Sequence, residues 1–289
     1  MSKIILITGT SNGFGNDVAK TLGAAGHRVF ATMRDIDGRH RDAAKALQSR
    51  GIETLELDVT SNASVEAAFR NLAEKTGGKL DVLINNAGMA SAGLSETFTP
   101  EQVRDMFDVN VFGVQRVIRA ALPEMQKNKS GLIVNIGSIL GRVTIPFLGL
   151  YGASKHAVEA MTDSYRYELS QLGIDVVLIQ PGPYPTGLYT AIQAPADAGR
   201  ADRYGDVAAL PGKFAEFLQG VFSGANAPDP HDVATALVRL IETPAGQRSD
   251  RVIVGAAFGA DFANSAIQPI QGQLISGVGF DHLSKLNVV

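Results

Sequence analysis

The chain has 289 residues with 26 basic and 29 acidic side chains, giving a formal net charge of −3, and its Lys and Arg residues are scattered. This distribution excludes the basic surface that nucleic acids or anionic membranes require. The chain contains no cysteine, which excludes disulfides, thiol nucleophiles and thiolate metal ligands, and its five histidines include no pair at metal-ligand spacing.

The length fits one large α/β domain, and no repeat or low-complexity tract divides it, so we expect a single domain over residues 1–289. The first apolar run, Ile4 to Ile7, is too short for a signal peptide or a membrane span and breaks at Thr8-Gly9. We therefore expect a cytoplasmic protein with no membrane contact and no metal.

A strand, a glycine-rich loop and a helix open the chain. The apolar run Ile4 to Ile7 leads into TGTSNGFG over residues 8–15, and a helix can open at Asp17. Glycines let the backbone approach a diphosphate closely, and the free amides at the helix start attract its oxygens. An ordinary strand-to-helix turn would show the same pattern, so this loop alone is a weak indicator.

The second predicted strand, Arg28 to Met33, is followed directly by Arg34. In a dinucleotide-binding sheet this strand end faces the adenosine ribose, where a carboxylate would bind the 2′-hydroxyl and an arginine would bind a 2′-phosphate. Arg34 therefore favours NADP(H) over NAD(H). Two alternatives stay open: Arg34 is merely solvated, or the nearby Asp35 binds the ribose.

The third predicted strand, Thr54 to Val59, alternates apolar residues and carries Asp58 near its end. Asp58 either binds an adenine amine or is a simple loop acid. A helix follows with Ser61 as its cap.

A fourth strand, Asp81 to Ile84, runs into Asn85-Asn86-Ala87-Gly88, where asparagines and small residues can satisfy exposed backbone groups and let a cofactor lie close. The next helix starts at Thr99-Pro100-Glu101-Gln102, a capped sequence with proline at its first position. Asn110 falls inside this helix, where asparagine is a poor helix former and is more often a tolerated interior residue.

The fifth strand, Leu132 to Ile136, ends at Gly137-Ser138, which places the Ser138 hydroxyl beside the expected crevice unless it is a plain turn residue. The segment 139–150 is more apolar than an exposed loop should be, so we expect something apolar to lie against it.

Tyr151 and Lys155 share one face of a helix predicted from Tyr151 to about Leu172. A lysine cation about 4 Å from a phenol lowers the pKa of the phenol by about three units at an effective dielectric of ~20, and burial opposes this effect. We expect a phenol that titrates somewhat above neutral pH and can give its proton to a carbonyl. A chance pair on a surface helix is the alternative.

The sixth strand, Ile174 to Ile179, ends in PGPYPT over residues 181–186. Residues 184–230 are expected to form a substrate-binding lid, with a short amphipathic helix over Lys213 to Phe222. A helix over His231 to Glu242 and a strand over Arg251 to Val254 follow. For the tail, residues 255–289, an arm on another subunit and a frayed terminus both stay open.

Seven motifs occur in order along residues 3 to about 186: TGTSNGFG at 8–15, Asp58-Val59, Asn85 to Gly88, Asn110, Ser138, Tyr151 with Lys155, and Pro181-Gly182. Together they resemble the short-chain dehydrogenase/reductase family, and residues 231–254 resemble it in fold only. In the glycine loop, Phe14 replaces the commoner isoleucine, and in this the chain resembles some hydroxysteroid- and retinol-dehydrogenase-like members. Asn12 departs from the basic residue of many NADP-binding members, which leaves Arg34 as the main indication of NADP(H).

The resemblance implies a doubly wound α/β Rossmann fold, with a parallel sheet of seven strands in the order 3-2-1-4-5-6-7 and helices on both faces. It also implies a catalytic tetrad. Ser138 would orient the substrate oxygen, Tyr151 would exchange its proton, Lys155 would bind the nicotinamide ribose and lower the pKa of Tyr151, and Asn110 would hold a water. The implied cofactor-binding residues are Gly9, Ser11, Asn12, Gly13, Phe14, Gly15, Arg34, Asp58, Val59, Asn85, Ala87, Gly88, Tyr151, Lys155, Pro181, Gly182 and Thr186.

We therefore expect an NADP(H)-dependent oxidoreductase that interconverts a ketone or aldehyde with an alcohol on a small apolar substrate, assembled as a homodimer or homotetramer. A non-catalytic nicotinamide-nucleotide sensor or interaction protein is the alternative, although such proteins usually lose a tetrad residue. An epimerase or dehydratase of the extended branch would have a different glycine spacing.

Overall fold

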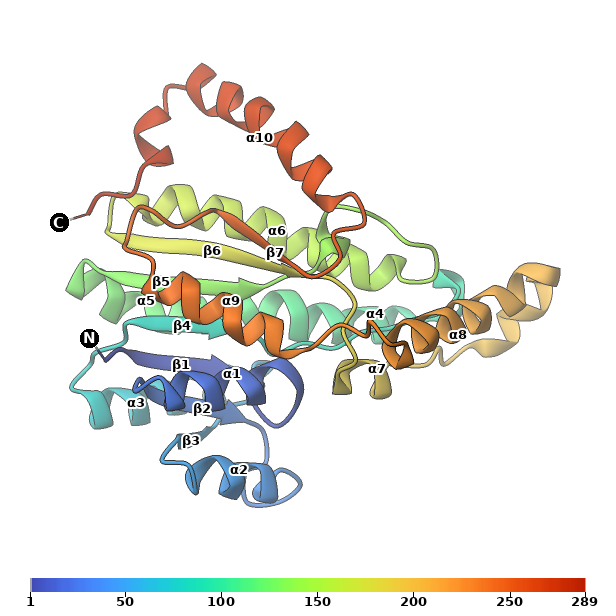
Figure 1. The fold of residues 1–289 in the computed structure, drawn as a ribbon, viewed down its shortest axis with the longest axis horizontal. Coiled ribbons are helices and arrows are strands. Elements are labelled where there is room, and N and C mark those ends of the chain that lie inside the picture. The colour runs from blue at the N-terminus through green and yellow to red at the C-terminus, as the bar shows by residue number, and fades with distance from the viewer. Residues whose placement is uncertain (1, 289) are drawn as a thin grey trace.

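One parallel sheet forms the centre of the computed structural model, which describes residues 2–288 (Figure 1). Its seven strands run in the order β3-β2-β1-β4-β5-β6-β7, and each neighbouring pair is parallel. The predicted strand order is therefore confirmed. The strands are β1 (Ile4–Thr8), β2 (Arg28–Met33), β3 (Glu53–Glu56), β4 (Val82–Asn85), β5 (Gly131–Ile136), β6 (Ile174–Pro181) and β7 (Arg251–Val254).

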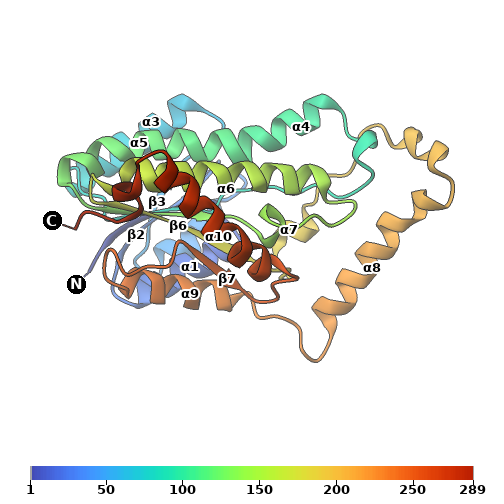
Figure 2. The same cartoon turned by 90° about the horizontal axis from the view of Figure 1, so that it is seen from above.

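Helices cover both faces of this sheet, as Figure 2 shows. Successive residues of a strand point to opposite faces. Ile5 and Ile7 of β1 accordingly pack with α1, α2 and α9, whereas Leu6 packs with α3, α5 and α6. The α-helices are α1 (Gly13–Ala24), α2 (Arg41–Gln48), α3 (Asn62–Thr76), α4 (Pro100–Phe107), α5 (Gly113–Asn128), α6 (Gly149–Ser170), α7 (Gly187–Thr190), α8 (Leu210–Ser223), α9 (His231–Glu242) and α10 (Ala260–Gly277).

The caps that the sequence indicates hold two helix starts in place. The Ser61 side chain accepts a hydrogen bond from the backbone N–H of Ser64, and Thr99 and Gln102 form a reciprocal capping box with Pro100 at the first helical position. Each cap satisfies amides that have no partner within the helix. Both helix starts are therefore determined by local sequence.

Several element boundaries differ from the sequence-based expectation; for example, α6 begins at Gly149 rather than Tyr151, and β6 ends at Pro181 rather than Ile179. The helix α1 begins at Gly13, inside the glycine loop, rather than at Asp17. The strand β3 ends at Glu56 rather than Val59, because the Asp58 carboxylate accepts hydrogen bonds from the backbone N–H and the hydroxyl of Thr60 at 2.9 and 2.8 Å. The observed strand therefore ends before Leu57 and Val59, the last two apolar residues of the predicted one.

The segment between β6 and α9 extends away from the sheet, beyond the strand ends to which the arrowheads point (Figures 1 and 2). It contains α7, a 3-10 segment over Ala198–Ala209, and α8, which includes the amphipathic helix expected over Lys213 to Phe222. This arrangement places the predicted lid at the carboxyl ends of the strands.

The tail is a long helix rather than a frayed terminus. Only Ala260 of α10 is buried, and Ile267, Ile270 and Leu274, which share one face of the helix at i, i+3 and i+7, are exposed. After α10 the chain returns to α6, where the backbone N–H of Asn287 donates to the carbonyl of Ser170 at 2.9 Å. Within residues 2–288, no helix combines the length and the continuous apolar character that crossing a membrane requires.

Candidate active site

A cavity of about 800 Å³ opens at the carboxyl ends of the strands. Ligands of open parallel sheets bind at this edge, outside the strand ends. The sequence-predicted site residues that line it are Gly9, Ser11, Asn12, Gly13, Phe14, Arg34, Asp58, Val59, Ala87, Gly88, Ser138, Tyr151, Lys155, Pro181, Gly182 and Thr186. The structure thus brings together residues from the carboxyl-terminal sides of β1 to β6 and from α6, while Gly15, Asn85 and Asn110 lie outside the lining.

The glycine loop fits closely against the loop that follows β4. At Gly9, where φ is +70°, a Cβ atom would lie 2.7 Å from the Cα of Ala87. At Gly15 a Cβ atom would lie 2.4 Å from both the Gly9 carbonyl oxygen and Nδ2 of Asn86. Side chains are excluded at both positions, so the two loops form a narrow backbone cradle of the kind that admits a diphosphate.

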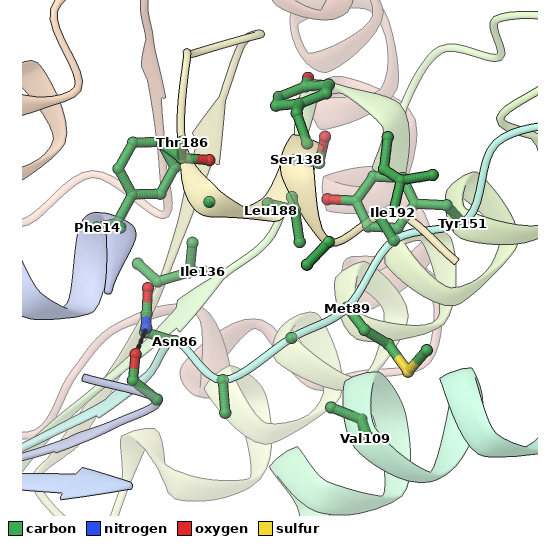
Figure 3. A pocket seen from close by; sticks show the side chains of 18 of the residues that line it. Phe14, Asn86, Met89, Val109, Ile136, Ser138, Tyr151, Thr186, Leu188 and Ile192 are labelled. Carbon is green, nitrogen blue, oxygen red and sulfur yellow. Dashed lines mark hydrogen bonds between the residues drawn. The ribbon is translucent and has the colours of Figure 1, made fainter. Parts of the chain in front are cut away.

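Asn86 holds this cradle together, as Figure 3 shows for the side chain. Its backbone N–H donates to Oγ1 of Thr8 at 3.0 Å, and its Nδ2 donates to the carbonyls of Thr8 and Gly9 at 2.9 Å. Asn85 points elsewhere, because its Nδ2 donates to Oδ1 of Asn135 at 2.9 Å inside the sheet. The sequence motif contains two adjacent asparagines, and strand alternation leaves only one of them at the cavity.

A cationic corner lies at the end of β2. Arg34, Arg39 and His40 line the cavity there, and no described carboxylate lies within ion-pair distance of either arginine. Burial lowers the pKa of His40, and the charges of Arg39 and Arg34 lower it further. Asp35 is outside the lining because its carboxylate accepts the backbone N–H of Arg39 at 2.9 Å. The corner is therefore suited to an anionic group.

Asn110 lies in a π-helical turn, Asp108–Phe112, that joins α4 to α5 without a break. Such turns occur frequently at functional sites. Its Oδ1 accepts the backbone N–H of Met89 at 2.9 Å, and its Nδ2 donates to the Met89 carbonyl at 2.9 Å and to Oγ of Ser154 at 3.0 Å. Asn110 is 1% exposed. In this structure it connects the loop after β4 to α6 from behind the cavity wall.

Ser138, Tyr151 and Lys155 come together at the junction of β5 and α6. The side chains of Ser138 and Tyr151 project into the same space in Figure 3. Lys155 lies one helical turn beyond Tyr151, donates from Nζ to the carbonyl of Ile136 at 2.9 Å, and lies 5.7 Å from the centroid of the Tyr151 ring. The expected juxtaposition of phenol, hydroxyl and ammonium is present.

Burial controls the acidity of these groups. Burial raises the pKa of Tyr151, the neighbouring Tyr189 raises it further, and the Ser138 hydroxyl opposes this rise by hydrogen bonding. Burial also lowers the pKa of Lys155 to about 8. The expectation that Tyr151 titrates somewhat above neutral pH is wrong in this structure, because desolvation outweighs the attraction of an ammonium that is bonded to Ile136.

The far end of the cavity is apolar. Ile139, Leu140 and Leu148 form one buried cluster with Tyr151, and side chains of the lid segment pack against it. The apolar partner expected for segment 139–150 is therefore present. The helix expected over Lys213 to Phe222 also contributes to the lining, through residues that the sequence did not assign to the site: Phe214, Phe217 and Leu218.

Comparisons with known proteins agree with this geometry. The family model for short chain dehydrogenases matches residues 3–197. A 3-ketodihydrosphingosine reductase from Bacteroides thetaiotaomicron is 38% identical over 205 residues, which cover 71% of this chain and 72% of that protein. An actinorhodin polyketide ketoreductase solved with NADPH is 29% identical, with a TM-score of 0.72 and coverage of 90% of this chain and 97% of that chain. A Burkholderia phymatum short-chain dehydrogenase/reductase solved with NAD is 27% identical, with a TM-score of 0.72 and coverage of 94% and 95%.

Proposed function

Because the chain belongs to the short-chain dehydrogenase family, whose members act on CH–OH or carbonyl groups with a nicotinamide cofactor, we propose that it is an NADP(H)-dependent oxidoreductase for apolar ketones, aldehydes and alcohols. The observation that carries the proposal is the meeting of Ser138, Tyr151 and Lys155 on the wall of one cavity that also reaches Arg34. A carbonyl whose oxygen is held between the two hydroxyls could take hydride at carbon from a nicotinamide and a proton at oxygen from Tyr151, and the alcohol could return both in the reverse direction.

The residues present fit a dinucleotide. The backbone cradle at Gly9 and Gly15 excludes side chains where a diphosphate would lie, and the first turn of α1 begins at Gly13 with free amides. When bound, the cofactor supplies hydride chemistry at its nicotinamide ring. Lys155 and Thr186 line the same cavity as the glycine loop and Tyr151, and they are the residues we assign to the nicotinamide half.

Tyr151 is assigned as the proton donor to the substrate oxygen. Its raised pKa keeps the phenol protonated at neutral pH, so the group is present as an acid. Ser138 holds the same oxygen from the neighbouring wall. Lys155, with a pKa lowered to about 8, still carries a proton at neutral pH and would stabilise the phenolate that forms when Tyr151 gives up its proton.

The cationic corner supports NADP(H) as the preferred cofactor. Arg34 and Arg39 line the cavity, and the nearest candidate for binding a 2′-hydroxyl, Asp35, is occupied by the backbone of Arg39. An arginine is the usual partner of a 2′-phosphate. Assembly as a homodimer or homotetramer remains a prediction.

Replacing Tyr151 with phenylalanine tests the mechanism. Tyr151→Phe should lower turnover at least ~100-fold while the affinity for the cofactor stays nearly unchanged, because the variant removes only the proton donor. Tyr167→Phe, on the same helix and outside the cavity, is the matched control. Retained turnover in Tyr151→Phe would remove Tyr151 from the mechanism.

A panel of apolar ketones, aldehydes and alcohols, followed by nicotinamide absorbance with both cofactors, tests the activity itself. Turnover should appear with at least one carbonyl or alcohol and should be more efficient with NADP(H) than with NAD(H). Tight binding of NADPH without turnover of any compound would instead favour a nucleotide-binding protein.

A further inference from the structure

Three tyrosines line the cavity, and two of their hydroxyls are accounted for. Tyr151 is the proposed proton donor, and the Tyr184 hydroxyl donates to Oδ2 of Asp232 at 3.1 Å. The hydroxyl of Tyr189 makes no hydrogen bond to any of residues 2–288. Tyr189 is half-buried, and its oxygen is not among the enclosed polar atoms without a partner, so the hydroxyl is accessible and free to meet a ligand atom in the cavity.

The ring of Tyr189 is held from behind by the lid. Tyr189 lies in the short helix α7, where its backbone N–H donates to the carbonyl of Thr186 at 3.1 Å. Its ring meets the edge of Phe222 of α8, with ring centroids 4.8 Å apart and an interplanar angle of 63°. This support places the phenol group without using its hydroxyl.

Tyr189 lines the same cavity as Ser138 and Tyr151. Its neighbours Leu188 and Ile192 pack against the buried cluster that contains Tyr151. Burial raises the pKa of Tyr189 to about 12, so the phenol stays neutral and keeps its proton to donate. Tyr189 therefore offers a hydrogen-bond donor in the part of the lid that adjoins Tyr151.

The rest of the lid lining is apolar. Between residues 187 and 230, the other residues that line the cavity are Gly187, Leu188, Ala191, Ile192, Phe214, Phe217 and Leu218. Within this part of the lid, Tyr189 contributes the single polar side-chain group to the lining. A ligand surrounded by these side chains would be apolar except where it meets Tyr189.

We infer that Tyr189 is a specificity residue whose hydroxyl donates to a second oxygen of the substrate, near the carbon that reacts. The preferred substrates are then apolar ketones or alcohols that carry a further hydroxyl or carbonyl oxygen close to the reacting group. The inference rests on the proposed function, since Ser138 and Tyr151 hold the first oxygen. It goes beyond that function by defining the chemistry of the substrate.

The test compares three ketones with the same alkyl chain: the simple methyl ketone, its α-hydroxy counterpart and the corresponding β-diketone. The wild-type enzyme should use at least one of the two oxygenated ketones with a kcat/KM about 10-fold above that of the simple ketone, as expected for a buried hydrogen bond. In Tyr189→Phe this preference should be lost, because kcat/KM for the oxygenated ketone falls about 10-fold while that for the simple ketone changes little.

Phe222→Leu tests the support of the Tyr189 ring, because it loosens the ring contact but keeps the hydroxyl. This variant should reduce the preference for the oxygenated ketone, but by less than Tyr189→Phe does. The KM for NADPH and the unfolding temperature of Tyr189→Phe should match the wild type, since the variant retains its ring.

Three results would overturn the inference: a wild-type enzyme that does not distinguish the ketones, a Tyr189→Phe variant that loses activity equally with all of them, or a rise confined to its cofactor KM. The wild-type comparison needs no variant to fold. Failure of the proposed function would give a different result, because Tyr151→Phe would then keep its turnover regardless of the ketone preference measured in Tyr189→Phe.

Discussion

Replacing Lys155 with methionine should stabilise the folded chain at neutral pH while it abolishes turnover. Lys155 is 7% exposed, and burial lowers its pKa from 10.5 to about 8. The unfolded chain therefore holds this proton more tightly than the folded chain does. This difference in the pKa of Lys155 destabilises the folded chain by about 3 kcal/mol. The destabilisation is fully present below pH 8, where Lys155 is protonated in both the folded and the unfolded chain.

Methionine removes the free-energy cost of burying the Lys155 ammonium, but it also removes one hydrogen bond. The Lys155 ammonium donates to the carbonyl of Ile136 at 2.9 Å, and losing that bond costs about 1 kcal/mol. The net gain at pH 7 is then about 2 kcal/mol, or a rise of roughly 4 °C in the unfolding temperature of a chain of this size.

The gain should depend on pH in a defined direction. As pH rises from about 8 to 10.5, the folded wild-type chain loses the Lys155 proton before the unfolded chain does, so wild-type stability increases through this window. The advantage of Lys155→Met should therefore shrink and be absent near pH 10.

Thermal unfolding of the cofactor-free wild type and Lys155→Met at pH 7 and pH 10 measures both effects. Lys127→Met, which replaces an exposed lysine on α5, is the matched control and should show no such pH-dependent gain. A Lys155→Met protein that is less stable than the wild type at pH 7, or whose advantage is the same at pH 10, would refute the reasoning.

Three further substitutions test the cavity and the fold. Arg34→Ala should weaken NADPH binding by about 10-fold or more and leave NADH binding nearly unchanged, since a charge-assisted hydrogen bond is worth about 1.5–3 kcal/mol. Arg50→Ala, which replaces an exposed arginine, is the control. Equal weakening of both cofactors would show that Arg34 does not contact the 2′-phosphate. Thr99→Ala should lower the unfolding temperature by about 2–4 °C through loss of its capping box, and an unchanged temperature would contradict that role. Gly9→Ala should destabilise the protein more than Gly51→Ala does. Both glycines have positive φ, but only at Gly9 would the added methyl have backbone atoms within 4 Å. Equal losses of stability in calorimetry would argue against the close contact between the two loops.

Local patterns in the amino-acid order were enough to predict most of the scaffold. Apolar runs indicate the strands of a sheet that is covered on both faces, because every residue of β4 and β6 is buried. The caps at Ser61 and Thr99 use bonds within three residues, so they can be recognised without knowing the fold. The motif order likewise indicated which strand ends supply the cavity.

Other features depend on which distant segments meet. The adjacent asparagines illustrate this, because Asn86 reaches Thr8 and Gly9 while Asn85 meets Asn135, and the choice follows from the strand's register in the sheet. The helix α10 was not predicted, although Ile267, Ile270 and Leu274 recur at helical spacing, because Pro269 and Gly272 within the segment are poor helix formers.

The resemblance carried by seven motifs implied the family and the order of the strands, and helical spacing alone predicted the juxtaposition of Tyr151 with Lys155, because that spacing is a short-range property. The acidity of that pair and the open hydroxyl of Tyr189 emerged only from the folded chain. Desolvation depends on every segment that excludes water, and here the lid and the strand ends meet across long separations in sequence to bury these groups.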